Sequence, residues 1–327
     1  MPVQVTIIGL GQIGASIGLA LGEHKDTIFR VGHDKEIKIE HEASKKGAVD
    51  KTEHNLPRAV EQARLVVLCL PVGEVRQTLE FIAQDLMDGT VVLDTSPVKV
   101  EVAKWAKDHL PEGSYYVGLV PAIGAEYLRE EGTGSASARV GLFSRSIFLV
   151  SAPRGTPGEA VELASNFVSL LGARPLLTDM LESDGLVTST LLLPQLTSAA
   201  LLNATVDQPG WKDARKIAGR AFTAATSGLD FDELKSLQLL TLHDRDNVLR
   251  ALDTLIASLQ GLRQDVENGD EAGLKERLQT AREGRDHWLD ERASADWVEM
   301  QRTPTEYPTL NERLFGSLMG RRTKTGK

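Results

Sequence analysis

Residues 3–20 read VQVTIIGLGQIGASIGLA, and this stretch decides the fold class of the chain. It begins with a short β-branched run, passes through a turn of the pattern G-x-G-x-x-G, and continues into a segment of helical composition. The glycine pattern alone is weak evidence, but between a first strand and a helix it is typical of a dinucleotide-binding unit. The stretch therefore predicts a strand, a phosphate-binding turn and a helix, in that order.

Each glycine of the turn has a physical reason. Gly9 permits the tight turn, Gly11 lets the backbone approach a pyrophosphate, and Gly14 lets the helix pack on the strand. The N-terminus of the helix then faces the phosphates. We expect Gln12 and Ile13, which lie between these glycines, to contact the cofactor as well. The alternative is that the glycines only close a strand-to-helix turn.

An acid follows at the end of the second predicted strand. Asp34 lies 20 residues after Gly14, where a carboxylate accepts hydrogen bonds from the adenosine ribose hydroxyls. The same carboxylate would repel a 2′-phosphate, so the sequence predicts NAD as the cofactor. Lys35 and His33 stand beside this acid and leave NADP open as an alternative.

Up to about residue 178, short apolar runs alternate with helical segments. Nearly continuous apolar strands separated by helices are typical of a parallel sheet covered on both faces. We therefore predict an α/β fold with a Rossmann-type, doubly wound, mainly parallel sheet in residues 1–178. Pro71 and Asp94 end two of its strands at the carboxyl edge and are expected to line the nicotinamide side of the cofactor site. The predicted strands cover residues 3–9, 27–34, 64–71, 90–96, 115–120, 146–151 and 174–179.

From residue 179 to 300 helical spacing replaces the β signal, which predicts an all-helical domain for substrate binding and dimerisation. Its segment 186–205, LVTSTLLLPQLTSAALLNAT, is apolar nearly all round. Such a helix is buried in a helical core or against a second subunit. We expect a homodimer through these helices. Residues 301–327, which end in GRRTKTGK, are expected to be a basic and flexible tail.

The composition excludes several classes of partner. A formal net charge of -9 argues against nucleic acid or an anionic membrane surface, because either would need a large basic face. Cys69 is the single cysteine and is read as a small core residue, which fits a reducing cytoplasm. No secretory signal is expected, and no apolar run reaches the roughly 18 residues of a membrane span. We expect a cytoplasmic protein whose partner is a small-molecule substrate.

Four segments together resemble the prephenate and arogenate dehydrogenases, a family with a 6-phosphogluconate dehydrogenase-like fold. They are IIGLGQIGASIGLAL at 7–21, DTSPVK at 94–99, VPAIGAE at 120–126 and ESDGLVTSTLLLPQL at 182–196. The resemblance covers roughly residues 3–260. It implies an NAD(P)-dependent oxidoreductase that transfers hydride between nicotinamide and a small substrate held between two domains, with a role in tyrosine biosynthesis.

The resemblance assigns part of the substrate pocket to segment 120–126. Val120, Pro121, Gly124 and Glu126 occupy the positions of the family's H-P-x-x-G-x-E turn. In the family, the histidine that heads this turn accepts the proton of the substrate hydroxyl as hydride leaves. Val120 stands at that position here and accepts no proton. The alternative for Glu126 is a structural or capping carboxylate.

The helical segment supplies the other family positions. Asp184 matches the aspartate of the family's H-D pair, although an N-cap role is the alternative. The paired histidines of the family's S-H-L-P-H segment correspond to Leu192 and Gln195. An arginine that would bind a substrate carboxylate falls near Ser227. By this resemblance Asp184 and Gln195 line the substrate pocket.

Three other groups are candidates for catalysis. Lys99 and Ser96, near the expected nicotinamide, are candidates for proton transfer, because a desolvated lysine titrates near neutrality. His243 lies on a helix that the family uses near its site. The alternatives are a surface lysine for Lys99 and a core or interface histidine for His243. No cluster has metal-ligand spacing, so no metal site is expected. The histidines expected to form no site are His24, His33, His41, His54 and His109.

A second function remains open. A protein that keeps the glycine turn and Asp34 but lacks the family's histidine and arginine also suits a nucleotide-binding sensor or scaffold without redox turnover. Cofactor binding is expected under both readings, so turnover is the property that separates them.

Overall fold

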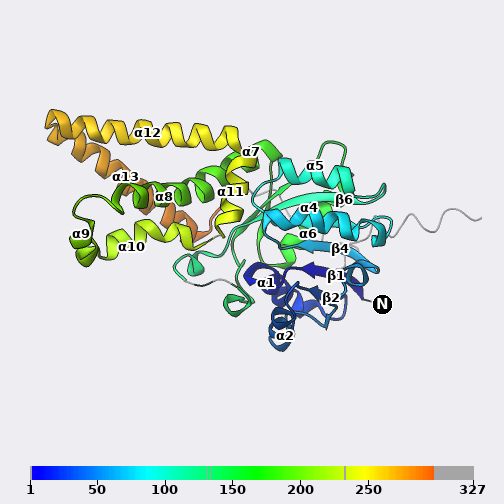
Figure 1. Ribbon diagram of the computed structural model, residues 1–327. Helices are drawn as coiled ribbons and strands as arrows, with labels where there is room; N and C mark the ends of the chain where they lie inside the picture. Colours follow the sequence, from blue (N-terminus) through cyan, green and yellow to red (C-terminus); the bar gives the residue numbers. More distant parts are fainter. Residues whose placement is uncertain (1, 131, 133, 232, 298–327) are drawn as a thin grey trace, which may run out of the picture. The chain divides into compact units, whose positions relative to one another are not determined.

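The computed structural model describes residues 2–130, 132, 134–231 and 233–297 (Figure 1). The chain divides into two compact units, which are described separately. Among the described residues, the first holds 2–183 together with 287–297, and the second is Asp184–Asp286. The sequence predicts this boundary at residue 178 and assigns all of 179–300 to the helical domain. The return of residues 287–297 to the first unit is a tertiary feature. The predicted tail at 301–327 lies outside the described residues.

The first unit contains one eight-stranded sheet with the order β3-β2-β1-β4-β5-β6-β7-β8 (Figure 1). All neighbouring strands pair in parallel except β6 and β7, which are antiparallel. The prediction of a doubly wound, mainly parallel sheet is confirmed, and the order of the first six strands is the Rossmann order. The strands are β1 Val3–Ile8, β2 Ile28–His33, β3 Lys51–Thr52, β4 Ala63–Leu68, β5 Val91–Asp94, β6 Tyr115–Pro121, β7 Ile147–Ser151 and β8 Arg174–Leu177.

The predicted strands match the observed ones to within a few residues, and β3 was not foreseen. This strand pairs with β2 through only Lys51 and Thr52, so it carries no apolar run that sequence reasoning detects. The core strands are apolar on both faces because helices cover both sides. For example, Leu65, Val66, Val67 and Leu68 of β4 are all fully buried.

Helices connect the strands and complete the core of the first unit. Part of this core is aromatic. Phe148 of β7 and Phe143, which precedes that strand, pack edge to face with ring centroids 5.1 Å apart. Both rings and Phe167 are fully buried, and each such side chain contributes roughly 1.5–3 kcal/mol to stability by leaving water. The helices are α1 Gln12–Ala20, η1 Leu21–His24, α2 Ile37–Lys45, α3 Leu56–Val60, α4 Val72–Ile82, η2 Ala83–Asp85, α5 Val100–His109, η3 Ala125–Tyr127, η4 Ser135–Ser137 and α6 Gly158–Leu170.

The described residues of the second unit form helices joined by turns and short irregular segments, and none of them forms a strand. Helix α12 ends at Asn268, and Gly269 with φ 64° supplies the left-handed residue that closes a helix C-terminus. The chain then reverses, and Arg277 of α13 pairs with Asp265 of α12 at 2.8 Å. Of the helices in this part of the chain, α7 begins and α13 ends in the first unit. The helices are α7 Met180–Val187, η5 Thr188–Leu192, α8 Leu193–Thr205, α9 Trp211–Ile217, α10 Arg220–Thr226, η6 Ser227–Asp230, α11 Leu234–His243, α12 Arg245–Asn268 and α13 Glu271–Ser294.

Three local expectations for this region are corrected. Asp184 lies inside α7 and is not an N-cap, because the helix already begins at Met180. The sequence of 231–269 carries a long amphipathic stripe and predicts Asp230 as the cap of its helix. In the structure this segment is broken at Asp244, whose ψ of 38° departs from helical geometry. Glu233, and not Asp230, precedes the first turn of α11.

The continuous helix Met180–Thr205 has the length and composition of a membrane span, with a mean hydropathy of 1.4 in its most apolar window. The prediction that no apolar run reaches that length is therefore wrong for this helix, which stays apolar on average although threonine, serine and glutamine lie among its leucines. Only 28% of the window is buried in the described chain. Length and composition are weak evidence for a membrane location, and core helices of water-soluble proteins have the same properties.

Candidate nucleotide-binding site

The glycine turn between β1 and α1 has the geometry that the motif predicts. Gly9 has φ 90°, and a Cβ there would lie 2.3 Å from the carbonyl oxygen of Cys69. A Cβ on Gly14 would lie 1.9 Å from the carbonyl oxygen of Gly9. A Cβ on Gly11, by contrast, would meet no atom within 4 Å. The turn is therefore closed against the sheet at Gly9 and Gly14 and open at Gly11, where a ligand is expected to approach.

Helix α1 offers its N-terminus at the same place. Gly11 is its N-cap and provides no side-chain hydrogen bond, and the first turn contains no acidic residue. The first N–H groups of a helix have no partner within the helix, and together with the helix dipole they favour an anion. Gln12 and Ile13 are half-buried at this end, and Gln12 Nε2 donates to the carbonyl oxygen of Ser137 at 3.3 Å. The arrangement suits the pyrophosphate of a dinucleotide.

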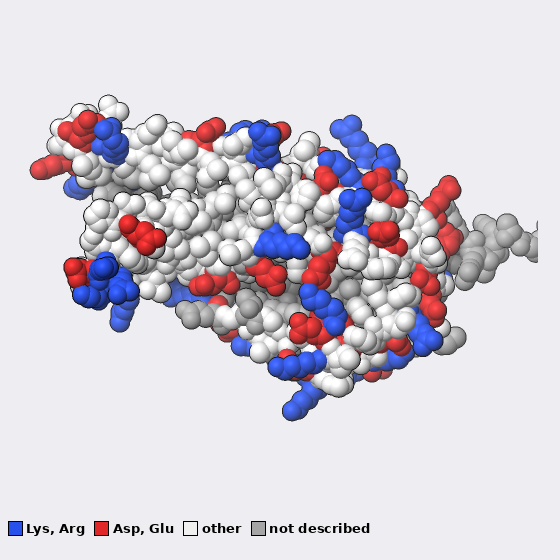
Figure 2. All heavy atoms as spheres, in the orientation of Figure 1, with Lys and Arg blue, Asp and Glu red and all other residues white. Residues whose placement is uncertain are grey.

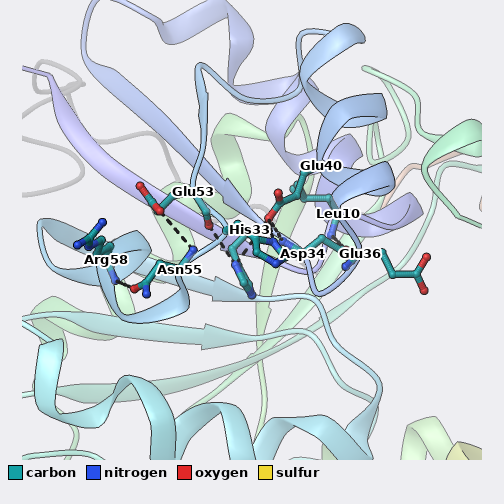
Figure 3. Close-up of polar contacts among 9 residues, drawn as sticks. Leu10, His33, Asp34, Glu36, Glu40, Glu53, Asn55 and Arg58 are labelled. Atoms are coloured by element: carbon teal, nitrogen blue, oxygen red, sulfur yellow. Dashed lines mark hydrogen bonds and ion pairs between the residues drawn. The ribbon is translucent and has the colours of Figure 1, made fainter.

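Asp34 connects the end of β2 to the glycine turn (Figure 3). Its Oδ2 accepts a hydrogen bond from the backbone N–H of Leu10 at 2.8 Å, and its Oδ1 accepts one from the backbone N–H of Glu36 at 3.0 Å. These bonds fix the orientation of a half-buried carboxylate beside the turn. The sequence predicted the acid at this place but not its bond to Leu10.

A second carboxylate lies behind Asp34. Glu40 of α2 is 4% exposed, and its Oε1 accepts the backbone N–H of Asp34 at 3.1 Å. His54 Nδ1 lies 3.2 Å from the same oxygen, and the ring centroids of His33 and His54 are 5.9 Å apart. The sequence analysis expected these histidines to form no site. The fold brings two of them together because β2 and the chain after β3 end side by side.

Lys35 is one of the two residues that left NADP open. It is exposed, and its Nζ lies 2.5 Å from Glu74 Oε1 of α4. A lysine already engaged by a carboxylate is a weaker partner for a 2′-phosphate. The pairing therefore favours the NAD reading over the NADP reading.

The end of β5 is a sealed polar cluster. Asp94 and Lys99 are both fully buried, and Lys99 Nζ lies 2.6 Å from Asp94 Oδ2 and 2.9 Å from the carbonyl oxygen of Asp94. Ser96 Oγ donates to Asp94 Oδ2 at 2.8 Å, and the Tyr116 hydroxyl donates to it at 3.3 Å. Lys99 is the N-cap of α5 and is 0% exposed, and its burial shows that the alternative reading as a surface lysine is wrong. Pro71, expected at the same edge, is exposed before α4.

Gly118 is a residue that the sequence analysis did not single out. A Cβ at this position of β6 would lie 2.4 Å from Lys99 Cδ and 3.1 Å from the Tyr116 hydroxyl oxygen. The glycine therefore provides the space through which the lysine reaches Asp94. A lone glycine inside a strand was the signal, since it often marks a close approach of another group.

Cys69 lies under the glycine turn. Burial raises the pKa of its thiol from 9.0 to about 12, so the thiol stays protonated near neutrality. A protonated thiol is a poor nucleophile and metal ligand. The reading of Cys69 as a small packing residue agrees with this surrounding.

The loop at the carboxyl end of β6 carries Val120. This residue pairs with Leu149 of the antiparallel strand β7, and the backbone N–H of Gly124 donates to the carbonyl oxygen of Leu142 at 2.7 Å. Val120 and Pro121 are half-buried, whereas Glu126 is exposed in η3. Two main-chain anchors thus hold a loop that presents an apolar side chain at the expected position of a base.

Arg292 reaches this loop from the far end of the chain. Its Nη2 donates to the carbonyl oxygen of Ile123, and burial lowers the pKa of the guanidinium. No carboxylate among the described residues forms an ion pair with Arg292. The sequence analysis missed it, because 169 residues separate the two partners and the end of α13 reads as a solvated helix.

The remaining predicted positions lie in α7, η5, α8 and α11. Asp184 and Gln195 are buried, at 3% and 2% exposure, whereas His243 is exposed at the end of α11. Thr188–Leu192 forms a π-helix, and Thr188 Oγ1 donates to Asp244 Oδ2. π-helical turns re-aim side chains and are frequent at functional sites. The π-turn coincides with the segment that matches the family's histidine-bearing helix.

Comparisons with known proteins agree with this geometry. Residues 17–177 match the family model described as prephenate dehydrogenase, nucleotide-binding domain. A prephenate dehydrogenase of Bacillus subtilis is 25% identical over 86% of this chain and 75% of its own length. A cyclohexadienyl dehydrogenase of Zymomonas mobilis is 25% identical over 86% of this chain and 94% of its own length.

A solved structure shares the fold. It is the prephenate dehydrogenase from A. aeolicus in complex with hydroxyphenyl propionate and NAD+, with a TM-score of 0.78 and 19% identity. The match covers 88% of this chain and 98% of that one. The Rossmann fold followed by a helical domain is therefore shared, as the sequence predicted.

Proposed function

We propose that this chain, which belongs to the prephenate/arogenate dehydrogenase family, transfers hydride between NAD and a small substrate. The observation that carries the proposal is the glycine turn, which is sterically closed at Gly9 and Gly14 and open at Gly11. Asp34 is held beside that turn by the Leu10 N–H. A turn that only joined a strand to a helix would have no need of an open face at an N-cap glycine.

NAD is the proposed cofactor, in line with the NAD+ complex of the related A. aeolicus enzyme. Gly11 and the start of α1 would hold the pyrophosphate, and Asp34 would meet the ribose hydroxyls. When bound, the nicotinamide supplies the hydride acceptor or donor. The chain's own part is to place that ring and to keep water from it.

The proton is the open part of the reaction. A positioned base contributes about 100- to 10,000-fold, and Val120 offers none. Lys99 and Ser96 stay candidates for proton transfer, although both side chains are engaged by Asp94. His243 and the pocket positions Asp184 and Gln195 also stay predictions, as does a substrate site between the two domains.

Prephenate and arogenate are the first substrates to test, because the relatives are named for such reactions. Steady-state assays with each, and with a panel of small hydroxy, keto and imino acids, would use NAD(H) and NADP(H). We expect prephenate turnover well below ordinary dehydrogenase rates and faster turnover of another acid. Replacement of Val120 by His should raise prephenate turnover, with Val120→Asn as the control that adds polarity without a base. Ordinary rates with the unaltered chain would contradict the proposed change of substrate.

A nucleotide-binding role without turnover is the second candidate. The glycine turn is intact, whereas a valine stands where the family has its base. This combination favours binding without turnover and weakens the proposal of hydride transfer. NADH binding measured by fluorescence together with no turnover of any panel substrate would support it. Saturable turnover of one substrate would exclude it.

We further propose a homodimer formed through the helical unit. Large apolar side chains are exposed on α12, and Figure 2 shows broad uncharged areas over the helical unit. They are Leu249, Ile256, Leu259 and Val266, each between 48% and 66% exposed. A second subunit that covered these side chains and the exposed face of helix Met180–Thr205 would remove them from water. Sedimentation should give twice the mass of 35.6 kDa, and a monomeric mass would contradict the proposal.

A further inference from the structure

Glu40 is a buried carboxylate that lacks a fixed cation. Its side chain is 4% exposed, and no lysine or arginine among the described residues forms an ion pair with it. The groups around its Oε1 are the Asp34 N–H at 3.1 Å and the imidazoles of His54 and His33. A buried carboxylate is costly unless a positive charge compensates it. A cation held by the same side chains would supply that charge.

The three side chains have the chemistry of a transition-metal site. Two imidazoles and one carboxylate are a known ligand set for zinc, in which a fourth position is left for water or another oxygen. Magnesium and calcium prefer oxygen ligands alone. The set therefore selects for a zinc-like ion.

The distances fit one ion between the three side chains. Tetrahedral ligands at about 2.1 Å from zinc lie about 3.4 Å from each other. Glu40 Oε1 lies 3.2 Å from His54 Nδ1 and 3.8 Å from His33 Nδ1. One ligand atom from each residue lies within 4.8 Å of the other two. The separation between Glu40 and His54 is thus close to the value for a bound zinc ion, and the separation between Glu40 and His33 exceeds it slightly.

One further oxygen lies beside His33. The carbonyl oxygen of Glu53 lies 3.0 Å from His33 Nδ1. Because a carbonyl and a carboxylate accept hydrogen bonds, Nδ1 of each histidine donates in the hydrogen-bonded network. With an ion bound, each ring would coordinate it through Nδ1 and carry its proton on Nε2.

An ion would reach the site through His54, whose side chain is 53% exposed. Its effect would pass to the cofactor site through two hydrogen bonds. Glu40 holds the N–H of Asp34, and Asp34 holds the N–H of Leu10 in the glycine turn. Figure 3 shows this chain of contacts from α2 to the turn.

We propose that His33, Glu40 and His54 bind one divalent transition-metal ion of the zinc class, with the Glu53 carbonyl or water as a further ligand. The site stands behind the carboxylate that orients the glycine turn. It is separate from the dehydrogenase reaction and does not depend on which substrate the chain oxidises.

The test is metal binding by the full chain after treatment with a chelator. Titration with zinc chloride by calorimetry should show one equivalent bound, and cobalt chloride should give the visible absorption of a coordinated ion. His54→Gln and Glu40→Gln should each weaken zinc binding at least tenfold. His41→Gln, an exposed histidine on the same helix α2, is the matched control and should bind like the unaltered chain.

Two results would overturn the site. One is the absence of stoichiometric zinc binding by the unaltered chain. The other is equal binding by His54→Gln, which changes a half-exposed side chain and so carries the test even if Glu40→Gln fails to fold. Zinc should also raise the melting temperature while magnesium does not, and an equal shift with magnesium would count against the imidazole ligands.

Discussion

Two strand ends at the same edge of the sheet differ in how far their polar groups are buried. At the end of β5, Asp94 and Lys99 form an ion pair with no solvent exposure, and the neighbouring polar groups turn inward to it. At the end of β1, the turn is closed below and open at Gly11. A polar motif at the carboxyl edge of the sheet can therefore stabilise the fold or bind a ligand, and the burial of its polar groups distinguishes the two roles.

The largest expected effect comes from replacing the buried lysine of the ion pair. Lys99→Met should lower the free energy of unfolding by roughly 3–5 kcal/mol, because Asp94 is left as an uncompensated buried charge. The loss should appear in denaturant unfolding followed by circular dichroism. Adding Asp94→Leu to this variant should recover part of the stability, since both charges are then gone. A variant as stable as the unaltered chain would mean that the pair is not sealed.

The open turn should respond in the opposite way. Gly11→Val adds a side chain where nothing lies within 4 Å, so stability should change little while NADH binding falls by at least about 100-fold. Fluorescence titration with NADH measures the loss. Gly158→Val is the matched control, because its Cβ also meets open space, at the start of α6. Unaltered NADH binding by Gly11→Val would overturn the cofactor site.

Asp34 is intermediate in burial between the buried ion pair and the open turn, and it contacts the turn. Asp34→Asn keeps an acceptor for the Leu10 N–H but removes the charge. We expect NADH binding to weaken by roughly 1–2 kcal/mol, with a smaller change for NADPH, since the repulsion of a 2′-phosphate is also removed. Titrations with both nucleotides give the ratio. Equal weakening for both would argue against Asp34 as the discriminating group.

The smallest expected effect concerns Cys69, which lies against Gly9 and Gly14 on the closed side of the turn. The reactivity of its thiol measures whether that side stays closed to solvent. Burial raises its pKa in the fold to about 12, above the ordinary value of 9.0, so the folded state favours the protonated thiol. This contribution to stability is complete below pH 9 and declines as the pH rises toward 12. A thiol reagent at pH 7 should react slowly with the native chain and quickly with the denatured chain. Rapid labelling of the native protein would show that the closed side opens.

The cofactor half of the site could be predicted because its determinants are local. Gly9, Gly11 and Gly14 lie within six residues, and the adjoining strand and helix follow from apolar spacing alone. Asp34 could be found because a strand, a turn and a helix have nearly constant lengths. These constraints depend on backbone sterics, which neighbouring residues impose on one another.

The groups that the sequence analysis missed depend on long separations. Arg292 contacts the carbonyl of Ile123 across 169 residues, and no pattern in either segment indicates the other. Gly118 makes room for Lys99, whose burial turns an expected surface lysine into half of an ion pair. Glu40 and His54 come together only when the second strand and the chain after β3 lie side by side.

The class of fold, the glycine turn and the acid beside it follow from the amino-acid sequence, because strand and helix periodicity and glycine sterics act over a few residues. Which polar groups are buried and which are open to a ligand depends on the folded chain. Burial depends on what the rest of the chain places over a side chain. Desolvation then makes an ion pair of Asp94 and Lys99 at one strand end and leaves Gly11 accessible at another.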